Sequence, residues 1–256
     1  MTESGVGAFD RDATHNRGYL YTTNAKLSSE LANRRLTSAA LAAADFAGKR
    51  VLDVGCGDGT YTMDLLREGS PASIYGFDPA REAVALAGQK GAGKPVTFAA
   101  HDAYSVPLPD DSFDIAHLRG VLHHLERPID ALREALRLAP ILIVLEPNGY
   151  NPILKCIEKL SRYHREHGEK SYSPASLDRW VEGLGAAVRR RRWVGLVPFF
   201  CPDAVARGLK FLEPALERTP LLRSAGCAVY VQVAQRASGV APRASEVAPR
   251  ACLVDE

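Results

Sequence analysis

One ten-residue segment, Val51 to Thr60, constrains the fold of this chain more than any other part of it. It begins with a short strand-like stretch that is apolar except for Asp53, and it continues with glycines at positions 55, 57 and 59. Glycine has no Cβ, so the backbone can turn sharply there and a ligand can approach it closely. A helical pattern starts near Thr60, so the segment predicts a strand, a ligand-binding turn and a helix in direct succession.

The following residues repeat this alternation of short apolar strands and helices. Further strands are predicted at 73–77, 96–100, 113–118 and 141–145, and helices at 60–68, 81–89 and 129–139. Helices at 153–167 and 174–184, a strand at 187–197, a helix at 203–217 and a last strand at 227–234 complete the pattern. Such alternation implies a parallel sheet with right-handed crossovers. We therefore predict an α/β fold: a Rossmann-like doubly wound sheet, mostly parallel with an antiparallel final strand, with helices on both faces.

The chain divides into three parts by composition. Residues 1–48 are predicted to form an N-terminal helical segment or lid, with one or two helices between Ala25 and Phe46. Residues 49–237 form the main domain, in which 151–185 is a helical insertion that also acts as a lid. Residues 238–256 repeat the sequence Val-Ala-Pro-Arg-Ala, which cannot bury much surface, and we predict that this tail is disordered.

Overall composition restricts the classes of partner. A net charge of +2 over 256 residues does not favour nucleic acid or an anionic membrane as an obligatory partner. The five cysteines include no C-x-x-C pair, which argues against a disulfide framework and a cysteine metal site. We expect a cytoplasmic protein, since no signal peptide and no membrane-spanning apolar run are visible. A homodimer is compatible with these features.

Three acids follow three predicted strands or end them. Asp53 is expected at the end of the first strand, Asp78 ends the second, and Asp102 follows the third. In open α/β sheets, ligands bind beyond the carboxyl ends of the strands. Because those ends share one edge of a parallel sheet, we expect the three carboxylates to serve one ligand.

The glycine spacing resembles that of a known enzyme family. A dinucleotide fingerprint reads G-x-G-x-x-G, whereas here the third glycine comes one residue earlier. This spacing, with an acid two residues before the first glycine, is similar to the loop of class I S-adenosylmethionine-dependent methyltransferases. The segment from Pro107 to Ile115 also resembles the small-molecule branch called type 11. The resemblance covers about residues 50 to 150.

The resemblance implies S-adenosylmethionine as the cofactor and indicates the residues that bind it. Asp78 is expected to accept hydrogen bonds from both ribose hydroxyls, and Asp102 from the adenine amino group. Tyr21, or Tyr19 near it, is expected to cover the methionine part. The full set of predicted cofactor-binding residues is Asp53, Gly55, Cys56, Gly57, Asp78, Pro79, Asp102, Ala103 and Tyr21.

The acceptor side is less well defined by the sequence. His123 and His124 follow the fourth strand, and either could take a proton from an acceptor hydroxyl, since histidine titrates near neutral pH. Loop packing is the competing explanation for both. Arg119 is predicted to bind an acceptor carboxylate or phosphate, with a surface ion pair as the alternative. Asn148, Tyr150 and Asn151 are also expected to reach the pocket.

We therefore expect methyl transfer to oxygen or nitrogen of a small molecule, with specialised metabolism as the expected setting. One alternative is a methyltransferase that acts on a macromolecule, although the Asn/Asp-Pro-Pro-Tyr/Phe motif of amino-methylating DNA enzymes is absent after the fourth strand. A second alternative is a non-catalytic S-adenosylmethionine-binding regulatory module. A nicotinamide dehydrogenase is disfavoured by the glycine spacing.

Overall fold

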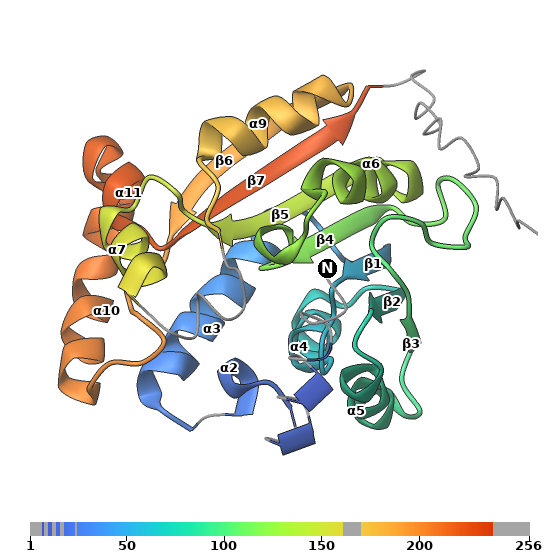
Figure 1. The fold of residues 1–256 in the computed structure, drawn as a ribbon, viewed down its shortest axis with the longest axis horizontal. Coiled ribbons are helices and arrows are strands. Elements are labelled where there is room, and N and C mark those ends of the chain that lie inside the picture. Colours follow the sequence, from blue (N-terminus) through green and yellow to red (C-terminus); the bar gives the residue numbers. More distant parts are fainter. Residues whose placement is uncertain are drawn as a thin grey trace, which may run out of the picture.

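A seven-stranded sheet forms the centre of the protein in the computed structural model, which describes residues 7, 10–11, 14–15, 18–23, 25–160 and 170–237 (Figure 1). The strands are β1 (Arg50–Val54), β2 (Ser73–Asp78), β3 (Val96–Ala100), β4 (Ile115–Arg119), β5 (Ile141–Pro147), β6 (Ala186–Val194) and β7 (Val229–Arg236). Their order is β3-β2-β1-β4-β5-β7-β6. Strands β1 to β5 pair in parallel, and β7 runs antiparallel to both of its neighbours. The predicted fold class is therefore confirmed.

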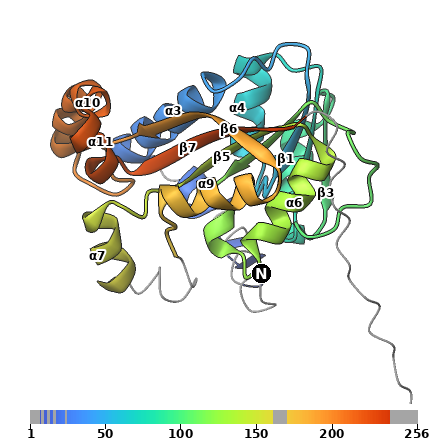
Figure 2. The ribbon, with the colours of Figure 1, turned by 90° about the horizontal axis from the view of Figure 1, so that it is seen from above.

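Helices cover both faces of this sheet. They are α2 (Leu20–Thr23), α3 (Leu27–Leu41), α4 (Thr60–Gly69), α5 (Arg81–Gly91), α6 (Pro128–Leu138), α7 (Pro152–Leu160), α9 (Pro174–Gly183), α10 (Asp203–Arg218) and α11 (Pro220–Gly226). Figure 2 shows α3, α4 and α10 on one side of the sheet and α6 and α9 on the other. Among the helices within the described ranges, none is long and apolar enough to cross a membrane.

The two-residue period of the strands divides the core between these faces. Val51 and Ile115 pack in the cluster under α3 and α4, whereas Leu52 and Leu118 pack in the cluster under α6 and α9. Asp53 and His117 follow the parity of Val51 and Ile115, so their side chains point toward α3 and α4. The same parity places Arg119 on that face.

Several elements differ from the sequence-based expectation. The segment from Ala25 to Phe46 holds a single helix, α3, and α11 was not predicted. Ser173 caps the N-terminus of α9, because its side chain accepts a hydrogen bond from the Ser176 N–H. The predicted tail and the second half of the helix predicted at 153–167 lie outside the described residues.

A partly buried ion pair joins the N-terminal helix α3 to α10. The Arg35 guanidinium donates to both Glu217 carboxylate oxygens, at 2.8 and 2.5 Å. Two parallel hydrogen bonds of this kind fix the direction as well as the distance of a contact. This pair therefore holds α10 against α3, and it positions the loop before α10 at the edge of the cavity described below.

Candidate functional site

The loop after β1 has the sharp turn that its glycines predict. Gly55, Gly57 and Gly59 have φ values of 69°, 53° and 75°, a region that side chains other than glycine rarely adopt. The backbone N–H groups of Gly55 and Cys56 donate to the Phe77 carbonyl at the end of β2. The loop is therefore fixed to the neighbouring strand as well as to its own.

A cavity of about 680 Å³ lies at the carboxyl ends of the parallel strands. Its wall includes Gly55 after β1, Asp78 at the end of β2, Arg119 at the end of β4 and Glu146 near the end of β5. This is the edge of an open α/β sheet at which ligands bind, and the volume lies within the range of small-molecule sites.

The cavity brings together most of the predicted cofactor-binding residues. Those that line it are Gly55, Cys56, Gly57, Asp78, Pro79, Asp102 and Ala103. Asp78 accepts from the Gly57 N–H at 3.0 Å and from the Ala80 N–H at 2.9 Å. Burial raises the pKa of its carboxyl to about 6, against these hydrogen bonds, which lower it. Asp102 is exposed and accepts from the Tyr104 N–H.

Asp53 does not line the cavity, unlike the other predicted acids. It is buried under the loop, where one carboxylate oxygen accepts from the Thr62 hydroxyl at 2.5 Å and the other contacts His117 Nδ1 at 2.8 Å. The structure therefore corrects the prediction that Asp53 binds the cofactor directly, because its carboxylate is not part of the cavity wall. Strand parity turns its side chain toward α4, where it ties β1 to α4 and β4.

Asp58, inside the glycine loop, is a site residue that the sequence reasoning missed. It is buried, lines the cavity, and accepts from the Thr22 hydroxyl at 2.7 Å and the Thr60 N–H at 3.1 Å. Burial opposes its ionisation, but these hydrogen bonds and Lys90, at 3.1 Å, outweigh that cost and lower its pKa. Asp58 thereby attaches the N-terminal segment to the loop.

Of the two candidate tyrosines, Tyr19 is the one whose side chain the structure describes. Its ring lines the cavity and lies so close to Gly57 that a Cβ on that glycine would be 2.5 Å from the Tyr19 ring. Burial raises the pKa of the Tyr19 hydroxyl far above its usual value. Tyr21 belongs to α2, and its side chain lies outside the described part of the structure.

A histidine and a glutamate form a pair on the acceptor side. His123 Nδ1 lies 2.8 Å from a Glu146 carboxylate oxygen, and both residues line the cavity. The other Glu146 oxygen accepts from the Val121 and Leu122 N–H groups, each at 2.8 Å. His124 also lines the cavity, with its ring centroid 3.9 Å from that of His123. The contact with Glu146 distinguishes His123 from His124, a distinction that the sequence alone does not provide.

Arg119 lines the cavity and is held by neutral groups. Its guanidinium stacks over the Tyr61 ring, 3.6 Å from the centroid, and donates to the Thr37 hydroxyl and to the Asn33 side-chain oxygen. Among the described residues, no carboxylate lies within ion-pair distance of Arg119, so the surface ion pair considered above is absent there.

The asparagines after β5 do not reach the cavity. Asn148 is fully buried, and its amide group donates to the backbone carbonyls of Ser224 and Cys227. The Asn151 side chain accepts from the Ile153 N–H at the start of α7. Tyr150 is 47% exposed. The expectation that these residues reach the pocket is therefore wrong, because their side chains fix the turn and the helix that follow β5.

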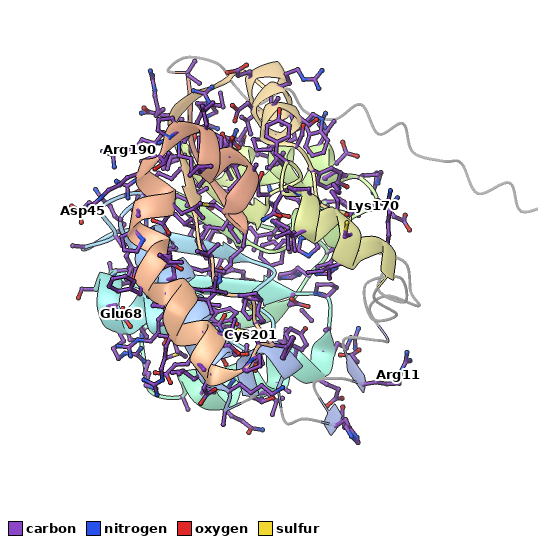
Figure 3. The ribbon with its side chains drawn as sticks, turned by 90° about the vertical axis from the view of Figure 1, so that its left-hand side faces the viewer. Arg11, Asp45, Glu68, Lys170, Arg190 and Cys201 are labelled. Carbon is purple, nitrogen blue, oxygen red and sulfur yellow. The ribbon has the colours of Figure 1, made fainter. Side chains whose placement is uncertain are left out.

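The apolar part of the cavity wall comes from elements outside the alternating core. Val197, Phe199 and Phe200 precede α10, and Leu154 and Ile157 belong to α7. Figure 3 looks onto α10 and shows Cys201, which follows Phe200, at the N-terminal end of that helix. These residues add an apolar compartment to the polar end that the strands provide.

Comparisons with known proteins identify the family that this domain resembles. Residues 52–150 match the family model Methyltransf_11, whose description is "Methyltransferase domain". An uncharacterized methyltransferase of Schizosaccharomyces pombe is 34% identical over 110 residues, which cover 40% of this chain and 37% of that protein. The 2-phytyl-1,4-naphtoquinone methyltransferase of Synechococcus elongatus is 31% identical over 145 residues, which cover 55% of this chain and 58% of that protein. The chain thus matches roughly a third to three fifths of the length of these two relatives.

A solved structure extends the likeness of fold. The methyltransferase in complex with the Haloferax volcanii Trm112 methyltransferase activator superposes with a TM-score of 0.65 at 19% identity, covering 89% of this chain and 96% of that one. The resemblance drawn from the glycine loop is confirmed, and S-adenosylmethionine is the cofactor. Residues 52–150 therefore form a methyltransferase domain that is similar to those of the class I S-adenosylmethionine-dependent methyltransferases.

Proposed function

We propose that this protein transfers the methyl group of S-adenosylmethionine to a small-molecule acceptor. The observation that carries this proposal is the continuity of one cavity, whose wall holds the glycine loop and Asp78 at one end and the His123–Glu146 pair at the other. A cofactor placed on the loop and an acceptor placed beside His123 would share this space, which is what a direct transfer needs.

The cofactor end supplies groups that match the parts of S-adenosylmethionine. In the proposed arrangement Asp78 accepts from the ribose hydroxyls, and Asp102 and the Ala103 N–H bind the adenine edge. The Gly55–Gly57 backbone allows close approach, with Cys56 and Pro79 completing the wall. Tyr19 lies over the loop, at the place proposed for a tyrosine that covers the methionine part.

At the acceptor end, His123 is the proposed general base. The cofactor, when bound, supplies an activated methyl group, so the protein binds, aligns and excludes water. Glu146 accepts from Nδ1–H of His123 and so directs the other ring nitrogen to act as a proton acceptor. An acceptor hydroxyl or enol would give its proton to that nitrogen as its oxygen displaces the cofactor's sulfur at the methyl carbon, so that the O–C bond would form while the S–C bond breaks. An amine acceptor that binds neutral would need no such base.

A small acceptor is favoured by the apolar compartment beside the histidines. Phe199, Phe200, Leu154 and Ile157 enclose it, and such walls suit an apolar molecule with one reacting polar group. The name of the Synechococcus relative specifies a naphthoquinone, which has this character. The Haloferax volcanii methyltransferase was solved in complex with an activator protein, so a macromolecular acceptor is the competing proposal.

The proposed domain division follows the cavity wall. Residues 1–48 and the insertion 151–185 act as lids, since Tyr19, Asn33 and Leu154 from these segments line the cavity of the domain at 49–237. We propose a cytoplasmic setting for the protein, with a homodimer as a possible assembly. A disordered tail at 238–256 remains a prediction from composition.

A methyl-transfer screen tests the proposed function. Protein incubated with methyl-labelled S-adenosylmethionine and a panel of phenols, quinols, carboxylic acids and amines should form a labelled small product together with S-adenosylhomocysteine. Bulk RNA and cell protein serve as macromolecular acceptors in parallel. Label found only in these polymers would overturn the small-molecule proposal. Binding of S-adenosylmethionine without any turnover would favour the non-catalytic module.

The affinity for S-adenosylhomocysteine should fall as the pH is lowered through 6. Only the ionised Asp78 accepts from both ribose hydroxyls, and its pKa is about 6 before the ligand binds. Below that pH the carboxyl must give up its proton to bind, which weakens affinity by up to about tenfold per pH unit. Calorimetric titration between pH 5 and 8 measures this slope.

The control for this slope is Asp78→Asn, which keeps the size of the side chain and removes its titration. This variant should bind about 10- to 150-fold more weakly at pH 7.5, the range for losing a charged hydrogen bond. Its affinity should also be nearly independent of pH. An equal pH slope in the variant and the parent protein would contradict the role of Asp78.

A further inference from the structure

Arg119 is a cationic group in the cavity wall whose hydrogen-bonding and stacking partners carry no net charge. Its guanidinium contacts Thr37, Asn33 and Tyr61. Burial raises the pKa of the Tyr61 hydroxyl to about 12, so this tyrosine stays neutral near pH 7 and supplies no negative charge. Within the described residues no carboxylate comes within 4.0 Å of the guanidinium.

A guanidinium in such a position costs free energy unless an anion compensates it. Burial lowers the pKa of Arg119, which shows that its surroundings penalise the charged form. Asp64 and Asp53 act on the guanidinium from beyond ion-pair distance, and each has a partner of its own, Arg67 for Asp64 and His117 for Asp53. A ligand in the cavity is therefore the remaining source of an anion near Arg119.

The strand order indicates which ligand group arrives there. Along the sheet edge the order β3, β2, β1, β4 presents Asp102, Asp78, the glycine loop and Arg119 in succession. Neighbouring strands lie about 4.8 Å apart, so this row spans about 14 Å. A cofactor with its adenine at Asp102 and its ribose at Asp78 crosses the glycine loop and extends its amino-acid end toward β4.

The surroundings of Arg119 favour the cofactor over the acceptor. Arg119 has the strand parity of Asp53 and points toward α3 and α4, where Tyr61 lies in the first turn after the glycine loop. The apolar compartment is built by α7 and the segment before α10, not by the glycine loop or α4. The arginine is thus part of the loop side of the cavity.

We infer that Arg119, positioned by Asn33, Thr37 and Tyr61, binds the α-carboxylate of the cofactor's methionine part. This inference rests on the cofactor placement given under the proposed function. It gives Arg119 a binding role toward the cofactor in place of the acceptor role expected from the sequence. The planar guanidinium presents paired N–H donors to a carboxylate, which a lysine does not.

The test compares two ligands that differ only in the carboxylate. S-Adenosylhomocysteine has it, and its decarboxylated analogue, S-adenosyl-3-thiopropylamine, does not. In calorimetric titrations, Arg119→Gln should weaken binding of S-adenosylhomocysteine about 10- to 100-fold, as expected for a charged hydrogen-bonded pair. The same variant should leave the affinity for the analogue unchanged or improve it, because the ammonium group is no longer repelled by the arginine.

Arg127→Gln is the matched control, because Arg127 also stacks over a tyrosine but is exposed and does not line the cavity. It should leave both affinities unchanged. Equal weakening of both ligands in Arg119→Gln, or no weakening of either, would overturn the inference while leaving the cofactor placement intact. Failure of the parent protein to bind either ligand would instead remove the cofactor placement, and the inference with it.

Discussion

Replacement of His123 by glutamine is expected to lower kcat about 10²- to 10⁴-fold for an acceptor that must lose a proton. Glutamine keeps a hydrogen-bonding group near Glu146 but cannot accept a proton near pH 7. The affinity for S-adenosylhomocysteine should not change, since His123 lies on the acceptor side of the cavity. Single-turnover measurement of methyl transfer, combined with calorimetry, separates these two effects.

Two variants sharpen this prediction. Glu146→Gln retains an oxygen for the Val121 and Leu122 N–H groups but presents an amide N–H to His123 Nδ1, which favours the wrong tautomer. It should lower kcat and change the pH profile of turnover. His124→Gln should have a much smaller effect on kcat. If His124→Gln has the larger effect, the assignment of the base to His123 is wrong.

The cofactor end was accessible to sequence reasoning because its groups follow strand ends directly. Asp78 and Asp102 sit where two parallel strands finish, so the sheet order alone brings them to one edge. Asp53 was misplaced because it lies inside β1, where the two-residue period decides which face it takes. Counting parity from the apolar Val51 would have placed Asp53 under α4, away from the ligand.

The acceptor end required contacts that no local pattern encodes. Glu146 is the sixth residue of β5, and its pairing with His123 follows from the adjacency of β4 and β5 and from the hydrogen bond between the Gly120 N–H and the Leu145 carbonyl. The parallel order made this pairing predictable in principle.

The contact of Tyr19 and Thr22 with the glycine loop joins segments about 40 residues apart, and no periodicity signals it.

The second large effect is expected from Gly57→Val, which should abolish most cofactor binding. A non-glycine residue at φ 53° is strained, and a β-branched residue is worse there than alanine. The added Cβ would also come within 2.5 Å of the Tyr19 ring, in the part of the cavity wall where the cofactor is placed. Strain and steric conflict of about 3 kcal/mol together correspond to a loss of S-adenosylhomocysteine affinity of about 100-fold or more.

Gly88 supplies the control for Gly57, because it is exposed on α5 and a Cβ there meets no atom within 4 Å. Gly88→Val should leave S-adenosylhomocysteine affinity unchanged. Gly57→Val should also lower the Tm, and adding Tyr19→Ala should recover part of that loss, since it removes the steric conflict. The double variant should not recover affinity for S-adenosylhomocysteine, because the loop stays strained and the aromatic wall is missing. Near-normal affinity in Gly57→Val would mean that the cofactor does not rest on this loop, and the order of groups along the sheet edge would then need another explanation.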